Sequence, residues 1–365
     1  MKILFVLFSL DAGGVTAVTD TLAVEMVKMG HDVQYVSMLG QPTGHEPVSN
    51  VISFGYKTLN LKVFFLSFVR LWKFFVDNRD IDAVIVASAY PGIITTVAAR
   101  LAFHKAKVLI NFHTHVSAFA AIQPFTRKFL LSLGRIVLPF ADICANVSKI
   151  TAKDAADYFG LKRVATLHNP LKPYQKSENL EQHPPHPWLN NPDIFPIIAA
   201  GRLTDVKDFP LMFKSLLELK NMDARYKLII LGKGELESEL KALAYDLNLE
   251  DDIHFGGHVS NQRDYMALGR FLWLTSKFEG FNMVLLEALS AGIPCIATNY
   301  PTGIHEALDN GKYGLLINSR DPEMIAQQTY MFDQQPKHPP EFYQQRIEEF
   351  TPEVVTERYL KLLSS

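Results

Sequence analysis

Cysteine is scarce in this chain of 365 residues, which contains only Cys144 and Cys295. Both lie in apolar runs, ADICANV and IPCIAT. We therefore expect two buried, reduced thiols. The scarcity argues against a disulfide framework, an oxidising compartment and a zinc site built on cysteine.

Long apolar runs are also missing. No uncharged stretch reaches the length of about 18 residues that a membrane-spanning helix needs. The run ILFVLFSL follows Lys2, but it is short and has no A-x-A cleavage site. An apolar fraction of 48% with 20% charged residues is typical of a globular protein. We therefore expect a cytoplasmic protein with no transmembrane helix and no cleaved signal peptide.

Blocks of consecutive basic residues are absent, which argues against a nucleic-acid partner. The net charge of −2 is nevertheless unevenly divided. Residues 1–170 carry 17 basic and 11 acidic side chains, a net charge of +6, whereas the remainder carries 19 and 27, a net charge of −8. The first half is therefore expected to meet an anionic partner, either a phospholipid surface or a phosphorylated acceptor.

What the chain does have is a regular alternation of short apolar runs and helical patterns. The runs include KILFVLF, AVIVAS, KVLINF and ADICANVS in the first half, and FPIIAAG, YKLIILG, IHFGGH, FLWLTS, IPCIATN and YGLLIN in the second. Helices are expected between them, for example at residues 15–29, 61–76 and 93–103. Strands that alternate with helices predict parallel sheets with right-handed crossovers.

The alternation is interrupted once. Residues 169–193 contain six prolines and show no hydrophobic period, as expected of a linker. We predict an α/β protein of two Rossmann-like, doubly wound domains facing across a cleft, an N-terminal one (1–170) and a C-terminal one (194–350), joined by a linker (171–193). The last helix, 351–365, is expected to pack back on the N-terminal domain. A ligand is expected where the strands of both domains end.

Two glutamates stand out in SKFEGFNMVLLEALSAGIP. The pattern from residue 282 to 290 is that of a helix apolar nearly all round, so Glu287 is a carboxylate in an apolar setting. Glu279 lies on the loop ahead of this helix. Burying Glu287 without a partner is costly, and either a ligand's hydroxyls or an arginine of the same domain would compensate. Spacing does not choose between these two.

Other candidate ligand groups lie on loops that follow predicted strands. In GRLTDVKDF, after FPIIAA, Arg202 and Lys207 suit a diphosphate, although an ordinary solvated lysine fits equally well. In the turn ahead of the apolar helix, the backbone amides of Phe281, Asn282 and Met283 are placed to face an anion or a sugar oxygen.

Together these segments resemble the retaining glycosyltransferases of family 4, which have the GT-B fold. The matching text is GRL-x3-KDF, LGKGELESEL, FGGHV, EGFNMVLLEALSAGIPCIATNYPTG and YGLLI, and two glutamates separated by seven residues are that family's hallmark. In the first half the resemblance depends on GGV and one histidine. It implies transfer of a hexose or N-acetylhexosamine from a nucleotide diphosphate sugar, with UDP favoured. The acceptor would be a glycan or lipid-linked glycan of bacterial polysaccharide or lipopolysaccharide synthesis.

The resemblance also implies residue roles. Arg202 and Lys207 would hold the donor diphosphate without a metal or other cofactor, Glu279 the donor sugar and Glu287 the ribose. His113 would touch the sugar or phosphate, and with Arg202, Lys207 and Glu279 it forms the expected catalytic set. The remaining expected donor contacts are Gly13, Gly14, His258, Val259, Phe281, Asn282, Met283 and Val284.

The chain departs from the family pattern at a few positions. Asn282 stands where Gly or Pro is usual, which would alter contacts with the sugar. PTGIHEAL resembles the PSGPREIL of relatives that often use uridine-linked hexoses. Because Ile304 and His305 replace Pro and Arg, this resemblance favours a UDP-sugar as the donor but does not determine it. Retention without an obvious nucleophile and base predicts a front-face route in which the leaving diphosphate accepts the acceptor's proton.

Several alternatives stay open. A nucleotide-sugar epimerase of the same fold, or a nucleotide-binding module without activity, would share much of this pattern. His113-x-His115 could be a metal pair, but alternate strand residues point to opposite sides, so no metal site is expected. LGKGELE lacks the third glycine of a dinucleotide fingerprint, because Glu237 stands there.

The basic half contains a possible membrane helix. Residues 57–73 combine Phe, Leu and Trp with four basic residues, as a helix on an anionic membrane would, and residues 119–135 continue this composition. A core helix with a basic rim explains the same pattern. Docking on the cytoplasmic leaflet, where a lipid-linked acceptor would lie, is our hypothesis. The loops 40–50 and 116–128 match no motif, so acceptor, linkage and oligomeric state stay open.

Overall fold

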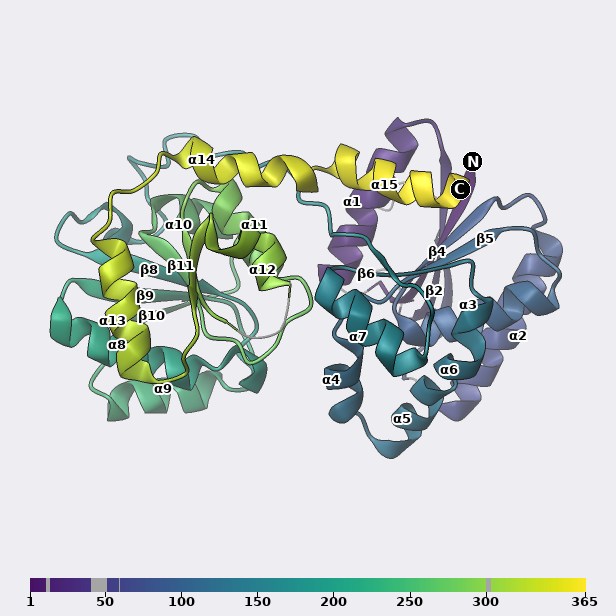
Figure 1. Cartoon of the computed structure of the whole chain (residues 1–365), viewed down its shortest axis with the longest axis horizontal. Coiled ribbons are helices and arrows are strands. Elements are labelled where there is room, and N and C mark those ends of the chain that lie inside the picture. Colours follow the sequence, from purple (N-terminus) through teal and green to yellow (C-terminus); the bar gives the residue numbers. More distant parts are fainter. Residues whose placement is uncertain (11–13, 41–50, 59, 300–302) are drawn as a thin grey trace. The chain divides into compact units, whose positions relative to one another are not determined.

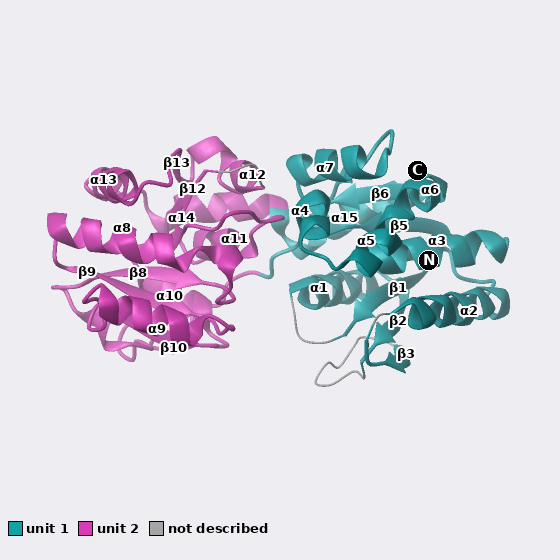
Figure 2. Cartoon of the chain, turned by 90° about the horizontal axis from the view of Figure 1, so that it is seen from below, with its two compact units in different colours: residues 1–172, 350–365 teal, residues 173–349 magenta. Residues whose placement is uncertain are grey.

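The computed structural model describes residues 1–10, 14–40, 51–58, 60–299 and 303–365. It divides into two compact units, shown in different colours in Figure 2. The first unit contains residues 1–172 and 350–365, and the second contains residues 173–349. Each unit is built on one parallel sheet of its own.

The first unit contains a seven-stranded sheet of order β3-β2-β1-β4-β5-β6-β7. Its strands are β1 (Lys2–Ser9), β2 (Asp32–Leu39), β3 (Val51–Tyr56), β4 (Ala83–Ala87), β5 (Lys107–Asn111), β6 (Ile143–Asn146) and β7 (Ala165–Thr166). The chain runs outward from β1 to β3 and returns to β4 on the other side of β1, so the strand order reverses between β1 and β4. At such a reversal the loops diverge and leave room for a ligand.

Helices cover both faces of this sheet (Figure 1). They are α1 (Gly14–Lys28), α2 (Leu61–Asp77), α3 (Ala89–Leu101), α4 (Val116–Ala121), α5 (Phe125–Ser132), α6 (Gly134–Val137), α7 (Lys149–Phe159) and α15 (Pro352–Ser364), with a 3-10 turn η1 (Leu138–Phe140). One core joins the sheet to α2 through α7. The other joins it to α1 and α15, where Val355, Tyr359 and Leu363 share a cluster with Leu22 and Met26.

The second unit contains a six-stranded parallel sheet of order β10-β9-β8-β11-β12-β13. Its strands are β8 (Phe195–Ala200), β9 (Tyr226–Leu231), β10 (Ile253–Gly257), β11 (Phe271–Leu274), β12 (Cys295–Thr298) and β13 (Gly314–Ile317). Its helices are α8 (Phe209–Met222), α9 (Glu237–Asp246), α10 (Gln262–Leu268), α11 (Met283–Ser290), α12 (Ile304–Ala307), α13 (Pro322–Asp333) and α14 (Pro340–Gln344). The 3-10 turns are η2 (Pro187–Asn190), η3 (Asp205–Lys207), η4 (Asp309–Gly311) and η5 (Gln345–Phe350). Here the strand order reverses between β8 and β11.

Local chemistry explains where several helices start and stop. Asp321 caps α13 ahead of Pro322, Thr351 caps α15 ahead of Pro352, and Asn282 caps α11, each with its side-chain oxygen on a backbone amide. Gly292, just past α11, has a φ of +87°, and a Cβ there would lie 2.5 Å from Pro340. The predicted doubly wound α/β class is confirmed for both units.

Three features differ from the sequence expectations. Helix α3 begins at Ala89 rather than at 93, because Pro91 falls in the first helical turn, where a missing N–H costs nothing. Strand β3 was not predicted. Helices α4 to α6 occupy much of a stretch whose first part, residues 116–128, was expected to be a loop. Cys144 and Cys295 are buried free thiols, as predicted.

Candidate functional site

An ion pair joins two of the predicted site residues of the second unit. Nζ of Lys207 lies 2.6 Å from Oε1 of Glu279, and the hydroxyl of Ser276 donates to the same oxygen at 3.0 Å. Both charged side chains are largely shielded, with exposed fractions of 15% and 18%. Lys207 ends the 3-10 turn η3 after β8, and Glu279 lies on the segment between β11 and α11. The fold therefore brings together two loops separated by 72 residues.

Glycines make room for this pair. Gly201, directly after β8, has a φ of +147°, and a Cβ there would lie 2.7 Å from Cε of Lys207. A Cβ on Gly232, directly after β9, would lie 1.9 Å from the carbonyl oxygen of Gly201. A Cβ on Gly234 would lie 2.2 Å from the carbonyl oxygen of Leu203. The glycines of LGKG thus serve close packing of two loops.

Arg202 behaves differently from Lys207. Its side chain is exposed, and within the described part of the chain no ion pair or hydrogen bond holds its guanidinium. It lies next to Gly201 at the carboxyl edge of the sheet. An exposed guanidinium beside a shielded lysine is able to swing onto an anion without breaking a protein contact.

Helix α11 presents an unusual amide at its start. Oδ1 of Asn282 accepts a hydrogen bond from the backbone N–H of Val284 at 3.1 Å, which caps the helix. Its Nδ2 is buried and, among the described residues, has no hydrogen-bond partner. Phe281 is buried, whereas Met283 and Val284 are half-buried. A buried amide donor without a partner is costly, and ligand oxygens are one means of satisfying it.

Glu287, on the same helix, has a different environment from Glu279. Nε2 of Gln262 donates to its Oε2 at 2.7 Å. Burial raises the pKa of Glu287 to about 7, although the charges of Arg263 and Lys207 act in the opposite direction. No ion pair within the described residues neutralises this carboxylate. The hydrogen-bond partner that the structure gives Glu287 is thus a glutamine of the same unit.

A polar cavity of about 310 Å³ lies beside Glu287. Its walls include Gln262 and Arg263 at the start of α10, together with Tyr174 and Ser177 from the proline-rich stretch. Asp264 anchors that stretch, because its carboxylate accepts hydrogen bonds from Tyr174 at 2.7 Å and Ser177 at 2.5 Å. The side chains of Gln262 and Tyr174 were not among the predicted site residues. The sequence gives little indication of either residue. Gln262 is marked only by its position after β10, and nothing marks Tyr174.

His258 and Val259 connect the sheet to this cavity. They directly follow β10, whose last residue Gly257 has a φ of +67°. His258 is exposed and Val259 is half-buried. In this part of the chain, the residues that line the cavity begin at Ser260, immediately after Val259. The structure thus places these two predicted donor contacts at the same edge of the sheet as Lys207 and the cavity.

The predicted residues of the first unit lie where its strands end. His113 follows β5 with a φ of +55°, and its Nδ1 lies 3.0 Å from Oδ1 of Asn169. Burial lowers the pKa of His113 to about 4, so the ring is neutral at pH 7. Gly14 opens α1, while Gly13 lies outside the described residues. Both Gly14 and His113 line a cavity of about 500 Å³.

His113 and His115 do not act together. Nδ1 of His115 lies 3.2 Å from Asp154, a different partner from that of His113. The described residues contain no group of three or more His, Cys, Asp or Glu side chains suited to a metal ion. None of the described helices is both long and apolar enough to cross a bilayer.

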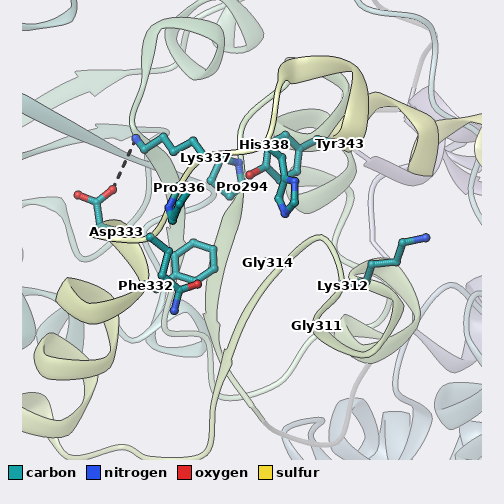
Figure 3. Close-up of a pocket in the computed structure, with 11 residues that line it drawn as sticks. Pro294, Gly311, Lys312, Gly314, Phe332, Asp333, Pro336, Lys337, His338 and Tyr343 are labelled. Atoms are coloured by element: carbon teal, nitrogen blue, oxygen red, sulfur yellow. Dashed lines mark ion pairs between the residues drawn. The ribbon is translucent and has the colours of Figure 1, made fainter.

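A further cavity, of about 200 Å³, lies at the opposite edge of the second sheet (Figure 3). Pro294 precedes β12 and Gly314 opens β13, so this cavity adjoins the amino ends of the strands. Its wall contains Asp333, whose Oδ2 accepts from Tyr226 at 2.6 Å and from Arg270 at 2.5 Å, while its Oδ1 lies 3.5 Å from Lys337. This set of contacts holds the end of α13 to the sheet and contains none of the predicted site residues.

Comparison with known proteins fits this geometry. A family model described as Glycosyltransferase Family 4 matches residues 12–173, and one described as Glycosyl transferases group 1 matches residues 182–346. The chain is 30% identical over 321 residues to the Campylobacter jejuni N-acetylgalactosamine-N,N'-diacetylbacillosaminyl-diphospho-undecaprenol 4-alpha-N-acetylgalactosaminyltransferase, covering 85% of this chain and 84% of the relative. A second Campylobacter jejuni protein, a GalNAc-alpha-(1->4)-GalNAc-alpha-(1->3)-diNAcBac-PP-undecaprenol alpha-1,4-N-acetyl-D-galactosaminyltransferase, is 25% identical and covers 100% and 98%.

The fold has solved counterparts. The Anabaena HepE structure in complex with UDP-glucose superposes with a TM-score of 0.81 at 15% identity, covering 100% of this chain and 99% of that one. At such low identity the likeness establishes the fold only. Together with the family models and the relatives, it shows that the chain is a glycosyltransferase of the GT-B fold. It belongs to the family 4 glycosyltransferases.

Proposed function

We propose that this enzyme moves a hexose or N-acetylhexosamine from a nucleotide diphosphate sugar, with UDP favoured, onto a lipid-linked glycan with retention of configuration. The observation that carries the proposal is the group formed by Lys207, Glu279 and Glu287 at the carboxyl edge of the second sheet. It combines a cation for phosphate, a carboxylate for the sugar and a second carboxylate for the ribose.

The ion pair explains how a donor would be received. Lys207 is bound to Glu279 in the structure, so an arriving diphosphate would take over the lysine and release the carboxylate. Glu279 would then accept hydrogen bonds from the donor sugar. Arg202, exposed beside Gly201, would add a second cation without losing a protein contact. Lys207 and Glu279 would therefore each have a partner both before and after the donor binds.

The nucleoside end of the donor fits the polar cavity. Glu287 projects there beside Gln262, and ribose hydroxyls would donate to its carboxylate. Tyr174 supplies an aromatic ring at the wall of the cavity. Hydroxyl donors stabilise the ionised form, so donor binding is expected to lower the raised pKa of Glu287.

The chemical step follows from these positions. The diphosphate held by Arg202 and Lys207 would leave on the same side from which the acceptor hydroxyl approaches, and its oxygen would take the acceptor's proton. The enzyme's contribution is then positional and electrostatic, and it requires no metal. Neutral His113 would donate or accept a hydrogen bond rather than supply charge.

The lipid-linked acceptor is supported by an unusual surface of the first unit. Helix α2 buries Ser67, Leu71 and Phe75 at a spacing of four residues, yet carries a second, exposed apolar stripe. Exposed apolar residues also occur on and directly after the other helices that belong to the same core. We call this set the apolar face: Leu61, Phe65, Val69, Trp72, Val76, Leu101, Phe103, Ile122, Phe125, Phe129, Ile136 and Phe140.

The apolar face is suited to an anionic bilayer. Among the described residues it contributes twelve exposed large apolar side chains, whereas the second unit has four, Met222, Tyr245, Met324 and Met331. Exposed Lys62, Lys73 and Lys128 lie among the apolar residues. Aromatic and aliphatic side chains would enter the lipid while lysines meet its headgroups. The printed names of the two Campylobacter relatives include a diphospho-undecaprenol or PP-undecaprenol acceptor, which agrees with this surface.

The substitution Lys207→Ala tests the proposal. A contact between the lysine and the diphosphate is worth roughly 4 kcal/mol before desolvation costs. Since about 1.4 kcal/mol changes a rate tenfold, losing the cation is expected to slow turnover of the donor by ~10²-fold or more. The measurement is hydrolysis of UDP-sugars in the absence of acceptor, after thermal-shift screening of uridine, guanosine and adenosine diphosphate sugars has identified the bound donor.

A matched control is Lys214→Ala, which removes an exposed lysine of α8. It should retain wild-type turnover, and both variants should keep the melting temperature of the parent. Wild-type turnover in Lys207→Ala would refute the assignment. An acceptor-independent conversion of the donor sugar to its epimer would instead indicate an epimerase.

A further inference from the structure

The segment that carries Glu279 is anchored to the rest of the second unit on both sides. Before Glu279, the backbone N–H of Lys277 donates to the carbonyl oxygen of Val206 at 2.7 Å. After Glu279, the carbonyl oxygen of Gly280 accepts from the backbone N–H of Gly303 at 3.1 Å. The first anchor lies on η3, and the second leads to α12. The backbone position of this carboxylate therefore depends on both η3 and α12.

Helix α12 is held in place by its surroundings. It has four residues, too few to be stable by itself. Ile304 and Ala307 are fully buried, and Nε2 of His305 lies 2.6 Å from Oδ1 of Asn299. The helix packs against α11, which begins shortly after Glu279 (Figure 1). Because the last four carbonyl groups of any helix lack a regular partner within it, α12 depends on donors from elsewhere in the unit.

Arg346 supplies such donors. Its side chain comes from η5, where the chain returns from the second unit to the first. Its Nε donates to the carbonyl oxygen of Ala307 at 3.1 Å, and its Nη2 donates to that of Glu306 at 2.5 Å. Nη1 lies 2.9 Å from Oε2 of Glu349, and Arg346 is only 8% exposed. A guanidinium offers the fixed fork of donors that two consecutive carbonyls require, and the end of a helix favours a cation.

These contacts form a continuous path from Arg346 to Glu279. The path runs from the guanidinium to the last carbonyls of α12, through one helical turn, and across the anchor at Gly280. In the structure Lys207 holds the carboxylate as well. Once a diphosphate has taken over the lysine, the hydrogen bond from Ser276 and the two backbone anchors remain from the contacts described above. The path therefore matters most when the donor is bound.

We propose that Arg346 is a positioning residue for the donor sugar, which acts through α12 and the anchor at Gly280 to hold Glu279 where it accepts the sugar's hydroxyls. The inference rests on the proposed function and adds a residue that does not itself touch the donor. Arg202 and Lys207 lie on a different segment, after β8. Loss of Arg346 should therefore weaken recognition of the sugar and leave recognition of the nucleotide largely intact.

The test compares UDP with UDP-N-acetylgalactosamine, whose sugar appears in the names of both Campylobacter jejuni relatives. Titration calorimetry on the full chain, without acceptor, gives the two dissociation constants. The ratio of the constant for UDP to that for the UDP-sugar isolates the contribution of the sugar. In Arg346→Met this ratio should fall ~10-fold, about the effect of losing one charge-assisted hydrogen bond, while the affinity for UDP stays within about twofold. Arg346→Lys, which keeps the charge without the fork, should give an intermediate ratio.

Hydrogen–deuterium exchange with UDP bound follows the path itself. In Arg346→Met the amides of residues 303–308 and 277–282 should exchange faster than in the wild type, because both segments lose an anchor. Gly303→Pro removes the N–H that bonds to Gly280, at a φ of −67° that proline adopts. It should speed exchange in residues 277–282 and lower the ratio as well, and it replaces Arg346→Met if that variant does not fold.

Arg270→Met is the matched control. It breaks the buried ion pair with Asp333 at the opposite edge of the same sheet, so it lowers the melting temperature without touching α12. Its ratio of dissociation constants, and its exchange in residues 277–282, should equal those of the wild type. An equal change in this control would show that lost stability alone is the cause, and it would overturn the inference.

The remaining outcomes separate this inference from the proposed function. A folded Arg346→Met with the wild-type ratio, or with unchanged exchange in residues 277–282, would show that the arginine only stabilises the unit. Glu279→Gln is measured alongside. A lowered ratio in Glu279→Gln alone would refute the role of Arg346 and leave the proposed function standing. An unchanged ratio in Glu279→Gln would refute the sugar contact on which both depend.

Discussion

Seven residues separate Glu279 from Glu287 in the sequence, yet the surroundings of the two carboxylates differ sharply. Glu279 is held by Lys207 and Ser276 on a loop, whereas Glu287 accepts one hydrogen bond from Gln262 on a helix. Burial raises the pKa of Glu287 to about 7. The sequence pattern predicted both as donor ligands, and the geometry is compatible with the division into a sugar ligand and a ribose ligand.

A pH-dependent stability follows for Glu287. Its pKa is about 7 in the folded chain and near 4.5 when unfolded, so the folded form binds the extra proton between these values. Its contribution to stability is complete below pH 4.5 and is lost as the pH rises through 7. Glu287→Gln removes this loss. The variant's melting temperature should therefore exceed that of the wild type by more at pH 8 than at pH 5.

Thermal unfolding at both pH values, without nucleotide, measures this difference. Glu239→Gln on α9 is a suitable control, because its carboxylate is exposed. It should give the same shift at both pH values. A Glu287→Gln shift that does not change with pH would show that the carboxylate is ionised in the folded chain at pH 5.

At the scale of elements, the loops after β8 and β9 determine where Lys207 lies. Gly201 and Gly232 pack backbone against backbone, and both have φ angles near +146°, a conformation that L side chains rarely adopt. The sequence showed the glycines but not their purpose. LGKG resembled part of a nucleotide fingerprint, and only the tertiary structure shows that its glycines face another loop.

Gly232→Ala is expected to destabilise the second unit and weaken donor binding together. Its Cβ would lie 1.9 Å from a backbone oxygen, so a loop must move, and Lys207 is carried by the loop it meets. Gly30→Ala, at a φ of +83° with no atom within 4 Å, should cost only about 1 kcal/mol from its backbone conformation.

Urea unfolding and UDP-sugar binding measure the two effects. Gly30 lies in the first unit, so its variant should leave donor affinity unchanged. If Gly232→Ala had the small cost of Gly30→Ala and normal donor affinity, the two loops would not be closely packed, contrary to the structure.

At the scale of the whole molecule, the uneven charge of the chain corresponds to its two units. The basic first half forms the unit with the apolar face, and the acidic remainder forms most of the unit with the Lys207–Glu279 pair. The sequence left two interpretations of residues 57–73, a membrane helix or a core helix. Helix α2 has features of both, since one stripe is buried and another is exposed.

Vesicle binding tests the apolar face. The chain should co-sediment with vesicles of phosphatidylglycerol and phosphatidylethanolamine and much less with pure phosphatidylcholine. Replacing Phe65 and Trp72 by Ser should weaken binding at least ~10-fold, because two large apolar side chains no longer enter the lipid. Replacing Tyr245 and Met331 of the second unit by Ser should have no effect. Sedimentation that is independent of anionic lipid would contradict the proposal.

The sequence by itself determined the alternation of strands and helices, the apolar helix of Glu287 and the family, because these depend on local periodicity and on motifs a few residues long. Only the tertiary structure decided which groups meet. Lys207 reaches Glu279 across 72 residues, and Asp264 binds Tyr174 across 90. Phe119 and Gln123, from the stretch 116–128 that matched no motif, line a cavity. Such contacts depend on how loops pack over strand ends, which no local pattern encodes.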